Sequence, residues 1–267
     1  MVNNSPIGMF DSGVGGFTLV KEAFNILPNE EIIYFGDTAR SPYGVKTDEE
    51  ILNCSRDIVE FLINEGVKLI IIACNTATIA SIETLQKEYK LPIIGVVEPG
   101  IEAALWNKDA KRIALIGTDI TVNSKKYEEI LMSKDKELKV LGKGCPNLVT
   151  LAEAGIFNNK VSEMAVKDCL KDLIKEDIDT LILGCTHFPL HLEDIKNIMP
   201  KGVNIVDPAR KTIEAASNLL RENNLLRKEK SQPKHRFICS GDIEGFEKVY
   251  NVVFKERNRI SDIAWNK

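Results

Sequence analysis

The chain has 267 residues, 44% hydrophobic and 28% charged, which is typical of a globular protein with a large core. Its formal net charge of -4 argues against nucleic acid or an anionic membrane as the main partner. The apolar runs are too short to span a bilayer and the first residues lack the features of a secretory signal, so we expect a cytoplasmic protein.

Short apolar runs, which we predict as strands, alternate along the chain with amphipathic segments, which we predict as helices. The predicted strands are 7–10, 32–35, 69–73, 93–97, 113–116, 139–141, 181–183, 204–206 and 237–239. The predicted helices include 48–65, 77–89, 123–133, 159–175 and 210–223. The charged segment 222–236 is predicted as a helix end and a loop. Nearly continuous apolar strands alternating with helices indicate an α/β protein whose parallel sheets are covered on both faces.

The order of these elements repeats after roughly 110 residues. LIIIACNT (69–76) has a counterpart in LILGCTHF (181–188), and GVVEPG (95–100) has one in NIVDPA (204–209). The run at 7–10 matches the run at 113–116 in the same order. We therefore predict two similar, pseudo-duplicated parallel-sheet α/β domains.

Polar residues stand where several predicted strands end: Asp11, Asp37, Cys74, Thr118 and Cys185. Ligands of parallel sheets bind at the carboxyl ends of the strands. The ends of both halves are therefore expected to form one shared cleft.

The glycine-rich stretch DSGVGGFT (11–18) suggests a dinucleotide loop, with Asp37 at a suitable distance to contact a ribose. However, Thr18 stands where the third glycine of that motif belongs. A turn with positive φ would explain the glycines equally well.

Six cysteines are scattered along the chain, at positions 54, 74, 145, 169, 185 and 239, with no pair at CxxC spacing. In a reducing compartment they are expected to be free thiols. A zinc site at His187 and His191 is disfavoured because Pro189 would break the helix that presents them. No metal is predicted.

Cys74 and Cys185 occupy matching positions in the two halves, each after an aliphatic run and each followed within two residues by threonine. Each is expected just before a helix, whose first amides would lower the thiol pKa. Two thiols facing each other, with sulfurs roughly 6–7 Å apart, suit the inversion of a stereocentre. The other four cysteines lack this pairing and are predicted to be structural.

A thiol is a modest base, so assisting groups are expected. Asp11, from the first half, and His187, two residues after Cys185, are the best candidates. The alternative roles are a helix cap for Asp11 and a packed imidazole for His187.

An ordered set of motifs through nearly the whole chain resembles the glutamate racemases of the cofactor-independent aspartate/glutamate racemase superfamily. The motifs are FDSGVGG (10–16), GDTARSPYG (36–44), ACNTA (73–77), GVVEPG (95–100), CP (145–146), LAEAG (151–155), GCTHFPL (184–190) and SGD (240–242).

The resemblance implies roles for individual residues. Cys74 and Cys185 would be the catalytic acid/bases, assisted by Asp11 and His187, with Asp37 and Glu153 as auxiliary carboxylates. The implied substrate contacts are Asp11, Ser12, Pro42, Tyr43, Gly44, Asn75, Thr76, Thr118, Thr121, Thr186 and His187.

The resemblance also implies two α/β domains, 1–98 plus 211–267 and 99–210, with the active site in the cleft between them. It implies no cofactor, a homodimer, and the supply of D-glutamate for peptidoglycan, and hence for cell wall and cell shape. Two positions depart from the usual pattern: Ser41 replaces a common valine, and LAEAG replaces LVEEG. The second departure weakens a detailed role for Glu153.

Three alternatives remain open. A racemase of aspartate or a related amino acid is one, although the CTH triplet at 185–187 is typical of the glutamate branch. An NAD-dependent oxidoreductase would leave the cysteine pair unexplained. A silent binding protein for an amino acid would bind its ligand but show no exchange of the α-proton.

Overall fold

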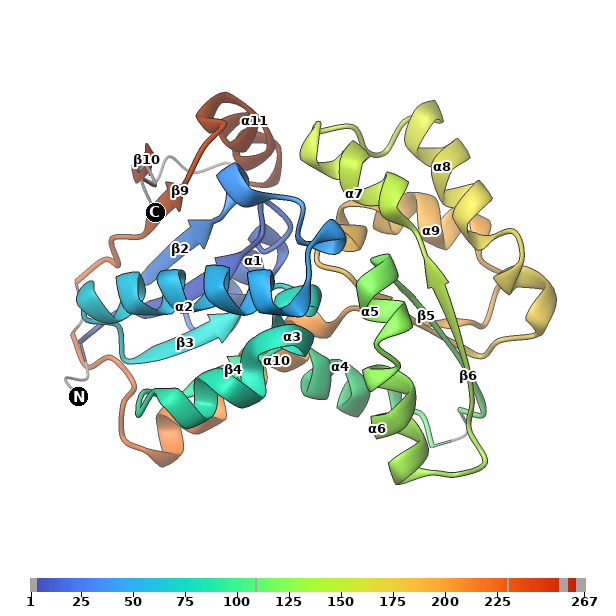
Figure 1. Ribbon diagram of the computed structural model, residues 1–267, viewed down its shortest axis with the longest axis horizontal. Coiled ribbons are helices and arrows are strands. Elements are labelled where there is room, and N and C mark those ends of the chain that lie inside the picture. Colours follow the sequence, from blue (N-terminus) through green and yellow to red (C-terminus); the bar gives the residue numbers. More distant parts are fainter. Residues whose placement is uncertain (1–3, 109, 230, 255–258, 263–267) are drawn as a thin grey trace.

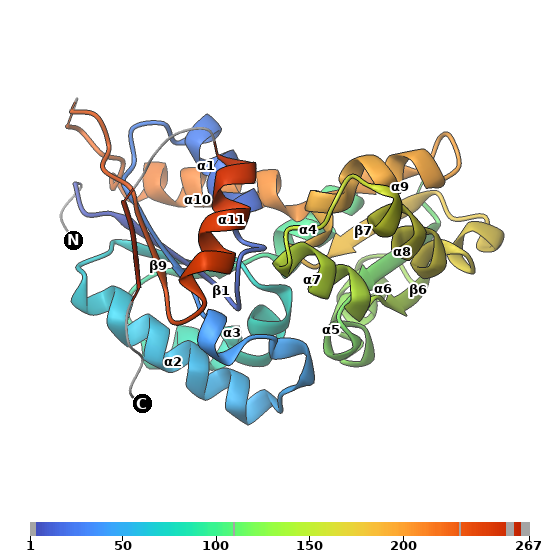
Figure 2. The same ribbon diagram turned by 90° about the horizontal axis from the view of Figure 1, so that it is seen from above.

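The chain folds into two lobes, each built on its own parallel β-sheet (Figure 1). The computed structural model describes residues 4–108, 110–229, 231–254 and 259–262. The lobes lie side by side in both views (Figure 2), and α4 (Val97–Ala104) of the second lobe packs against α10 (Pro208–Glu222) of the first where the lobes meet. None of the helices in the described ranges has the length and apolar character needed to cross a bilayer.

The first lobe contains a six-stranded sheet in the order β10-β9-β2-β1-β3-β4. Its strands are β1 (Ile7–Asp11), β2 (Ile32–Gly36), β3 (Leu69–Ile72), β4 (Ile93–Gly95), β9 (Arg236–Cys239) and β10 (Arg259–Asp262). Helices α1 (Phe17–Ile26), α10 and α11 (Ile243–Val253) cover one face, and α2 (Asp48–Asn64) and α3 (Asn75–Glu88) cover the other. Alternate residues of β1 therefore enter different apolar clusters: Met9 packs on the first face and Phe10 on the second.

The second lobe contains a four-stranded sheet in the order β6-β5-β7-β8. Its strands are β5 (Arg112–Gly117), β6 (Lys139–Gly144), β7 (Thr180–Gly184) and β8 (Asn204–Val206). Helices α7 (Pro146–Glu153), α8 (Lys160–Leu170) and α9 (Leu192–Ile198) cover one face. On the other face, α4 and α6 (Lys126–Lys134) enclose the core, and the short α5 (Asp119–Asn123) follows β5.

The predicted repeat is visible in the strand order. The run β2-β1-β3-β4 of the first sheet corresponds to β6-β5-β7-β8 of the second, with every pair parallel. The α/β class and the two similar sheets are thus confirmed. The domain boundaries stay a prediction; the second of them falls inside α10.

Several predicted boundaries were wrong. The strand expected at 93–97 ends at Gly95, and Val97 already belongs to α4. The helix expected at 123–133 is divided, because Lys125 adopts a left-handed conformation, with φ of 58°, between α5 and α6. Helices α1, α4, α7, α9 and α11 and strand β10 were not predicted.

The prediction that all six cysteines are free thiols was also wrong. Cys145 and Cys169 form a disulfide with a Cα–Cα distance of 5.7 Å. It joins the start of α7 to the last turn of α8, which pack in one apolar cluster. Their 24-residue separation gave no sign of this proximity, which depends on how α7 and α8 pack. The other four cysteines form no disulfide.

Candidate active site

A cavity of about 160 Å³ lies between the lobes, at the carboxyl ends of their strands. Its volume limits the occupant to a small molecule. Most of the predicted site residues line it: Ser12, Pro42, Tyr43, Gly44, Cys74, Asn75, Thr76, Thr118, Cys185, Thr186 and His187. The expected shared cleft is therefore present. Asp11, Asp37, Thr121 and Glu153 lie behind this wall.

Cys74 follows β3 and forms the N-cap of α3, where its Sγ accepts a hydrogen bond from Ala77 N at 3.4 Å. The residue is almost fully buried. Burial, together with the nearby Asp11 carboxylate, raises the pKa of Cys74 to about 12. The predicted lowering of this pKa was therefore wrong, because loss of hydration outweighs the helix amides.

Cys185 follows β7 and lies in the same cavity wall as Cys74. The chain then forms a short 3-10 helix (Phe188–His191), so the predicted α-helix N-terminus at Cys185 was wrong. Its Sγ instead lies 3.5 Å from Nδ1 of His187. The polar group next to the Cys185 sulfur is therefore a histidine side chain and not the backbone amides of a helix.

His187 connects this thiol to a carboxylate. Its Nε2 lies 2.5 Å from Oε1 of Glu153, which is on α7. Burial opposes a charge on the imidazole, but the Glu153 carboxylate and the Cys185 sulfur outweigh it and raise the pKa of His187 well above its usual value. The ring is thus favoured as the imidazolium.

Asp11 is fully buried and links the two lobes from behind the cavity wall. Thr186 Oγ1 donates to its Oδ2 at 2.8 Å, and Gly13 N donates to its Oδ1 at 2.9 Å. Burial raises the pKa of Asp11, and His187 and the Thr186 hydrogen bond offset part of the rise. The N-cap of α1 is Gly16, so Asp11 is not the helix cap considered as its alternative role.

The glycines of residues 11–18 allow the second lobe to approach closely. A Cβ at Gly13 would lie 2.0 Å from Glu153 Oε1, and one at Gly15 would lie 2.6 Å from Thr186 Oγ1. Neither glycine has a positive φ, so the turn explanation was wrong. Side chains of the second lobe occupy the space that a pyrophosphate would need against this loop.

Asp37 is buried beneath the cavity wall and holds it in place. Its carboxylate accepts hydrogen bonds from Arg40 Nε at 2.7 Å, from Ser240 Oγ at 2.8 Å and from the hydroxyl of Tyr43. Tyr43 itself lines the cavity. The contacts of Asp37 are thus structural, and its predicted catalytic role stays a prediction.

Three threonines form a hydrogen-bonded group across the lobes. Thr76 Oγ1, on α3, lies 2.9 Å from Thr118 Oγ1, at the end of β5. Thr121 Oγ1 lies 3.0 Å from Thr118 Oγ1 but does not reach the cavity. Thr121 therefore supports the other two.

Part of the cavity wall was not predicted from the sequence. The lining also includes Val45, Asp119, Pro146, Val149 and Thr150. Positions 146, 149 and 150 follow the i, i+3, i+4 spacing of one helix face, a signal that was available after the CP motif.

The Asp/Glu/Hydantoin racemase family model matches residues 18–216 of the chain. A glutamate racemase of Thermoanaerobacter pseudethanolicus is 41% identical over 256 residues, 96% of each chain. The structure is similar to crystal structures of glutamate racemase RacE1 from Bacillus anthracis (TM-score 0.91, 37% identity, 98% of both chains) and of glutamate racemase from Francisella tularensis in complex with D-glutamate (TM-score 0.91, 33% identity, 99% of both chains).

Proposed function

Because the chain belongs to the Asp/Glu/Hydantoin racemase family, we propose that it interconverts L- and D-glutamate by a two-base mechanism with Cys74 and Cys185. The observation that carries this proposal is that both thiols, one from each lobe, line a single small cavity. The enzyme is an isomerase that needs an acid/base on each face of its substrate.

The start of α3 supports binding of the substrate's α-carboxylate. Asn75 and Thr76 are the first two residues of this 14-residue helix, and their backbone N–H groups have no carbonyl partner within it. Such amides bind anions, and both residues line the cavity. This placement brings the α-carbon next to Cys74, which precedes them.

The proton transfers use both sulfurs. One thiolate removes the α-proton, and the electron pair of the C–H bond moves into the adjacent carboxyl group. The opposite thiol then donates its proton to the other face of the α-carbon and is left as the thiolate. Cys74 serves one enantiomer and Cys185 the other, so the reverse reaction uses the same groups.

The two thiols have different neighbours. The imidazole of His187 lies next to Cys185, where its Nδ1 can exchange a proton with the sulfur. Among the described residues, the hydrogen-bond partners of the Cys74 sulfur are Ser12 Oγ and Ala77 N, neither of which is charged. With its pKa raised to about 12, this thiol requires a positive charge nearby in order to ionise. The α-ammonium of an amino acid supplies that charge, and the Asp11 carboxylate attracts it.

The proposal includes a cellular role. D-glutamate would be supplied for peptidoglycan in the cytoplasm by a homodimer. The similarity to proteins named glutamate racemase supports the formation of D-glutamate, whereas its use in peptidoglycan, the cytoplasmic location and the homodimer stay predictions.

Isotope exchange tests the proposal. Incubation with L-glutamate in D₂O, without pyridoxal phosphate, should abolish net optical rotation and introduce deuterium at Cα. The absence of both changes would falsify the racemase assignment. Faster exchange with L-aspartate would favour the aspartate alternative, and binding without exchange would favour a silent binding protein.

The cysteine pair is tested by Cys74→Ala and Cys185→Ala. Each variant should lose racemisation by at least about 10²–10⁴-fold, since each removes one acid/base. Cys239→Ala is the control, because this cysteine is buried in the first lobe away from the cavity. Substantial turnover by either single variant would contradict the two-base mechanism.

A further inference from the structure

Tyr127 connects the two lobes at the edge of the cavity. It lies on α6 of the second lobe and is fully buried. Its hydroxyl donates a hydrogen bond to Oδ1 of Asn75, on α3 of the first lobe, at 2.6 Å. Asn75 lines the cavity directly after Cys74, so Tyr127 reaches the site through it.

The other end of the Asn75 amide is unpaired. Asn75 is only 2% exposed, and among the described residues its Nδ2 has no hydrogen-bond partner. A buried N–H without an acceptor is costly, and native proteins rarely retain one without a function. In a cavity proposed to bind glutamate, a carboxylate oxygen is the acceptor that this group lacks.

The hydroxyl of Tyr127 determines which end of the amide faces the cavity. With Oδ1 towards Tyr127, the single O–H proton is paired and Nδ2 remains available. With the amide turned over, that proton would have no other acceptor among the hydrogen bonds of the described residues. The hydrogen bond therefore favours the orientation that presents a donor to a carboxylate.

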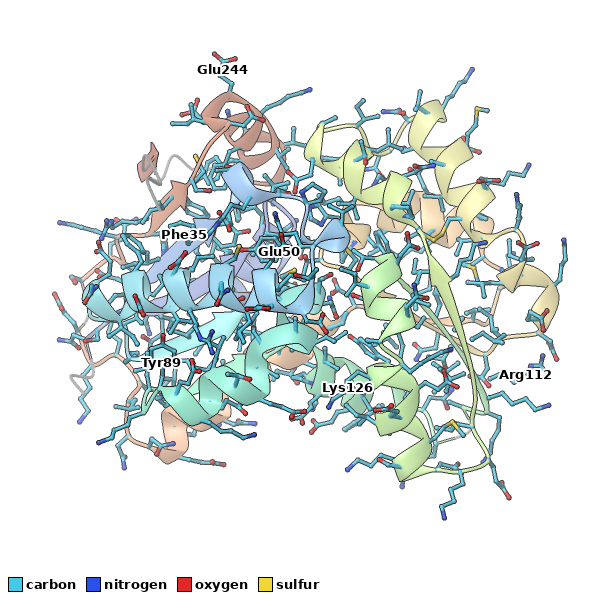
Figure 3. All side chains as sticks on the ribbon, in the orientation of Figure 1. Phe35, Glu50, Tyr89, Arg112, Lys126 and Glu244 are labelled. Atoms are coloured by element: carbon cyan, nitrogen blue, oxygen red, sulfur yellow. A yellow bond between two sulfur atoms is a disulfide. The ribbon has the colours of Figure 1, made fainter. Side chains whose placement is uncertain are left out.

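Packing holds the hydroxyl in place. Tyr127 belongs to an apolar cluster with Val97 and Ile101 of α4. A Cβ at Gly100 would lie 3.4 Å from the hydroxyl oxygen, so α4 passes close to it. The neighbouring Lys126, labelled between the lobes in Figure 3, forms an ion pair with Glu83 of α3 at 2.6 Å. Two successive residues thus connect α6 to α3.

We propose that Tyr127 is a positioning residue that orients the Asn75 amide so that Nδ2 binds a carboxylate of the substrate. This inference rests on the proposed function. It assigns part of substrate binding to a residue that does not touch the substrate, and it makes that binding depend on contact between the lobes.

The test is Tyr127→Phe, which removes only the hydroxyl. KM for glutamate should rise about tenfold, the effect of one lost hydrogen bond. Turnover number should change less than KM, because the carboxylate is bound in both the ground and the transition state. Tyr250→Phe is the matched control: its ring is also buried but lies in the aromatic cluster of the first lobe, so KM should not change.

A double-mutant cycle separates positioning from a general loss of stability. Asn75→Ala should raise KM, and adding Tyr127→Phe to it should raise KM no further. Additive effects, or an unchanged KM in Tyr127→Phe with wild-type thermal stability, would overturn the inference. The proposed function fails separately, if the wild-type protein does not racemise glutamate at all.

Discussion

His187 contacts both a catalytic candidate, Cys185, and a carboxylate, Glu153. Its Nδ1 lies 3.5 Å from the Cys185 sulfur and its Nε2 lies 2.5 Å from the Glu153 carboxylate. The imidazole therefore connects the Glu153 carboxylate to the thiol, with one ring nitrogen next to each group. The departure from LVEEG in the sequence left the role of Glu153 open, and its contact with His187 supports an indirect one.

Glu153→Gln should shift the pH dependence of turnover. The carboxylate raises the pKa of His187, so its removal should lower that pKa. If the imidazolium is the form of His187 that assists catalysis, activity falls as pH rises through this pKa, and the variant should lose activity at a lower pH. A pH–rate profile measures the shift.

The matched control for this change is Glu163→Gln, which removes an exposed carboxylate from α8. Its profile should match that of the wild type. An unshifted alkaline limb in Glu153→Gln would show that Glu153 does not set the charge of His187.

At the level of elements, α10 is the helix that joins the lobes, since it packs on α1 and α4 and approaches strands of both sheets. Its N-cap is Asp207, whose Oδ1 accepts a hydrogen bond from Ala209 N at 2.9 Å. Burial raises the pKa of Asp207 to about 6, and the hydrogen bond offsets only part of this effect. The side chain of Asp207 therefore stabilises the start of α10 by capping it, but burial of its charge destabilises the folded protein.

Asp207→Asn should stabilise the protein near neutral pH. Between pH about 4 and 6 the folded state binds more protons here than the unfolded state, so this group makes stability fall as pH rises. Asparagine keeps the cap without the charge. The free energy of unfolding of the variant should be higher by about 1–2 kcal/mol at pH 7.5 and little changed at pH 4. The gain is smaller than the whole pKa shift would give, because the side chain retains some solvent access.

Urea denaturation at these two pH values measures the difference. Asp242→Asn makes the same change at the exposed N-cap of α11 and controls for the loss of one negative charge. If Asp207→Asn is no more stable than the wild type at pH 7.5, the buried charge of Asp207 does not destabilise the protein and the prediction is wrong.

At the scale of the whole molecule, the cavity exists only where the lobes meet. Thr76 and Thr118 cross that boundary, as do Thr186 and Asp11. A substrate in this cavity contacts both lobes and should stabilise their arrangement.

D-glutamate should therefore raise the thermal unfolding midpoint of the protein by several degrees. A ligand at 100 times its Kd adds about 2.7 kcal/mol, and a chain of this size gains about 2–4 °C per kcal/mol. Cys74→Ala should retain most of this shift, since binding precedes proton transfer. Differential scanning fluorimetry measures both proteins, and the absence of a shift with the wild type would contradict binding at this site.

Most of the strands could be predicted from the sequence because buried parallel strands are continuous apolar runs, as at 69–72 and 181–184. Short helices such as α4 and α7 were not predicted because they begin directly after a strand and contain only about two turns, too few to show a helical pattern of apolar residues. Val149 and Thr150 of the cavity wall lie on α7 and were missed with it, although their spacing from Pro146 matches one helix face.

The sequence by itself determined the α/β class, the repeated order of elements and the two matching cysteines, since each follows from local patterning of apolar residues and strand ends. Only the tertiary structure decided which distant side chains meet. It paired Cys145 with Cys169, His187 with Glu153, and Tyr127 with Asn75. It also raised the pKa of Cys74, because that value depends on how completely the two lobes exclude water from the thiol.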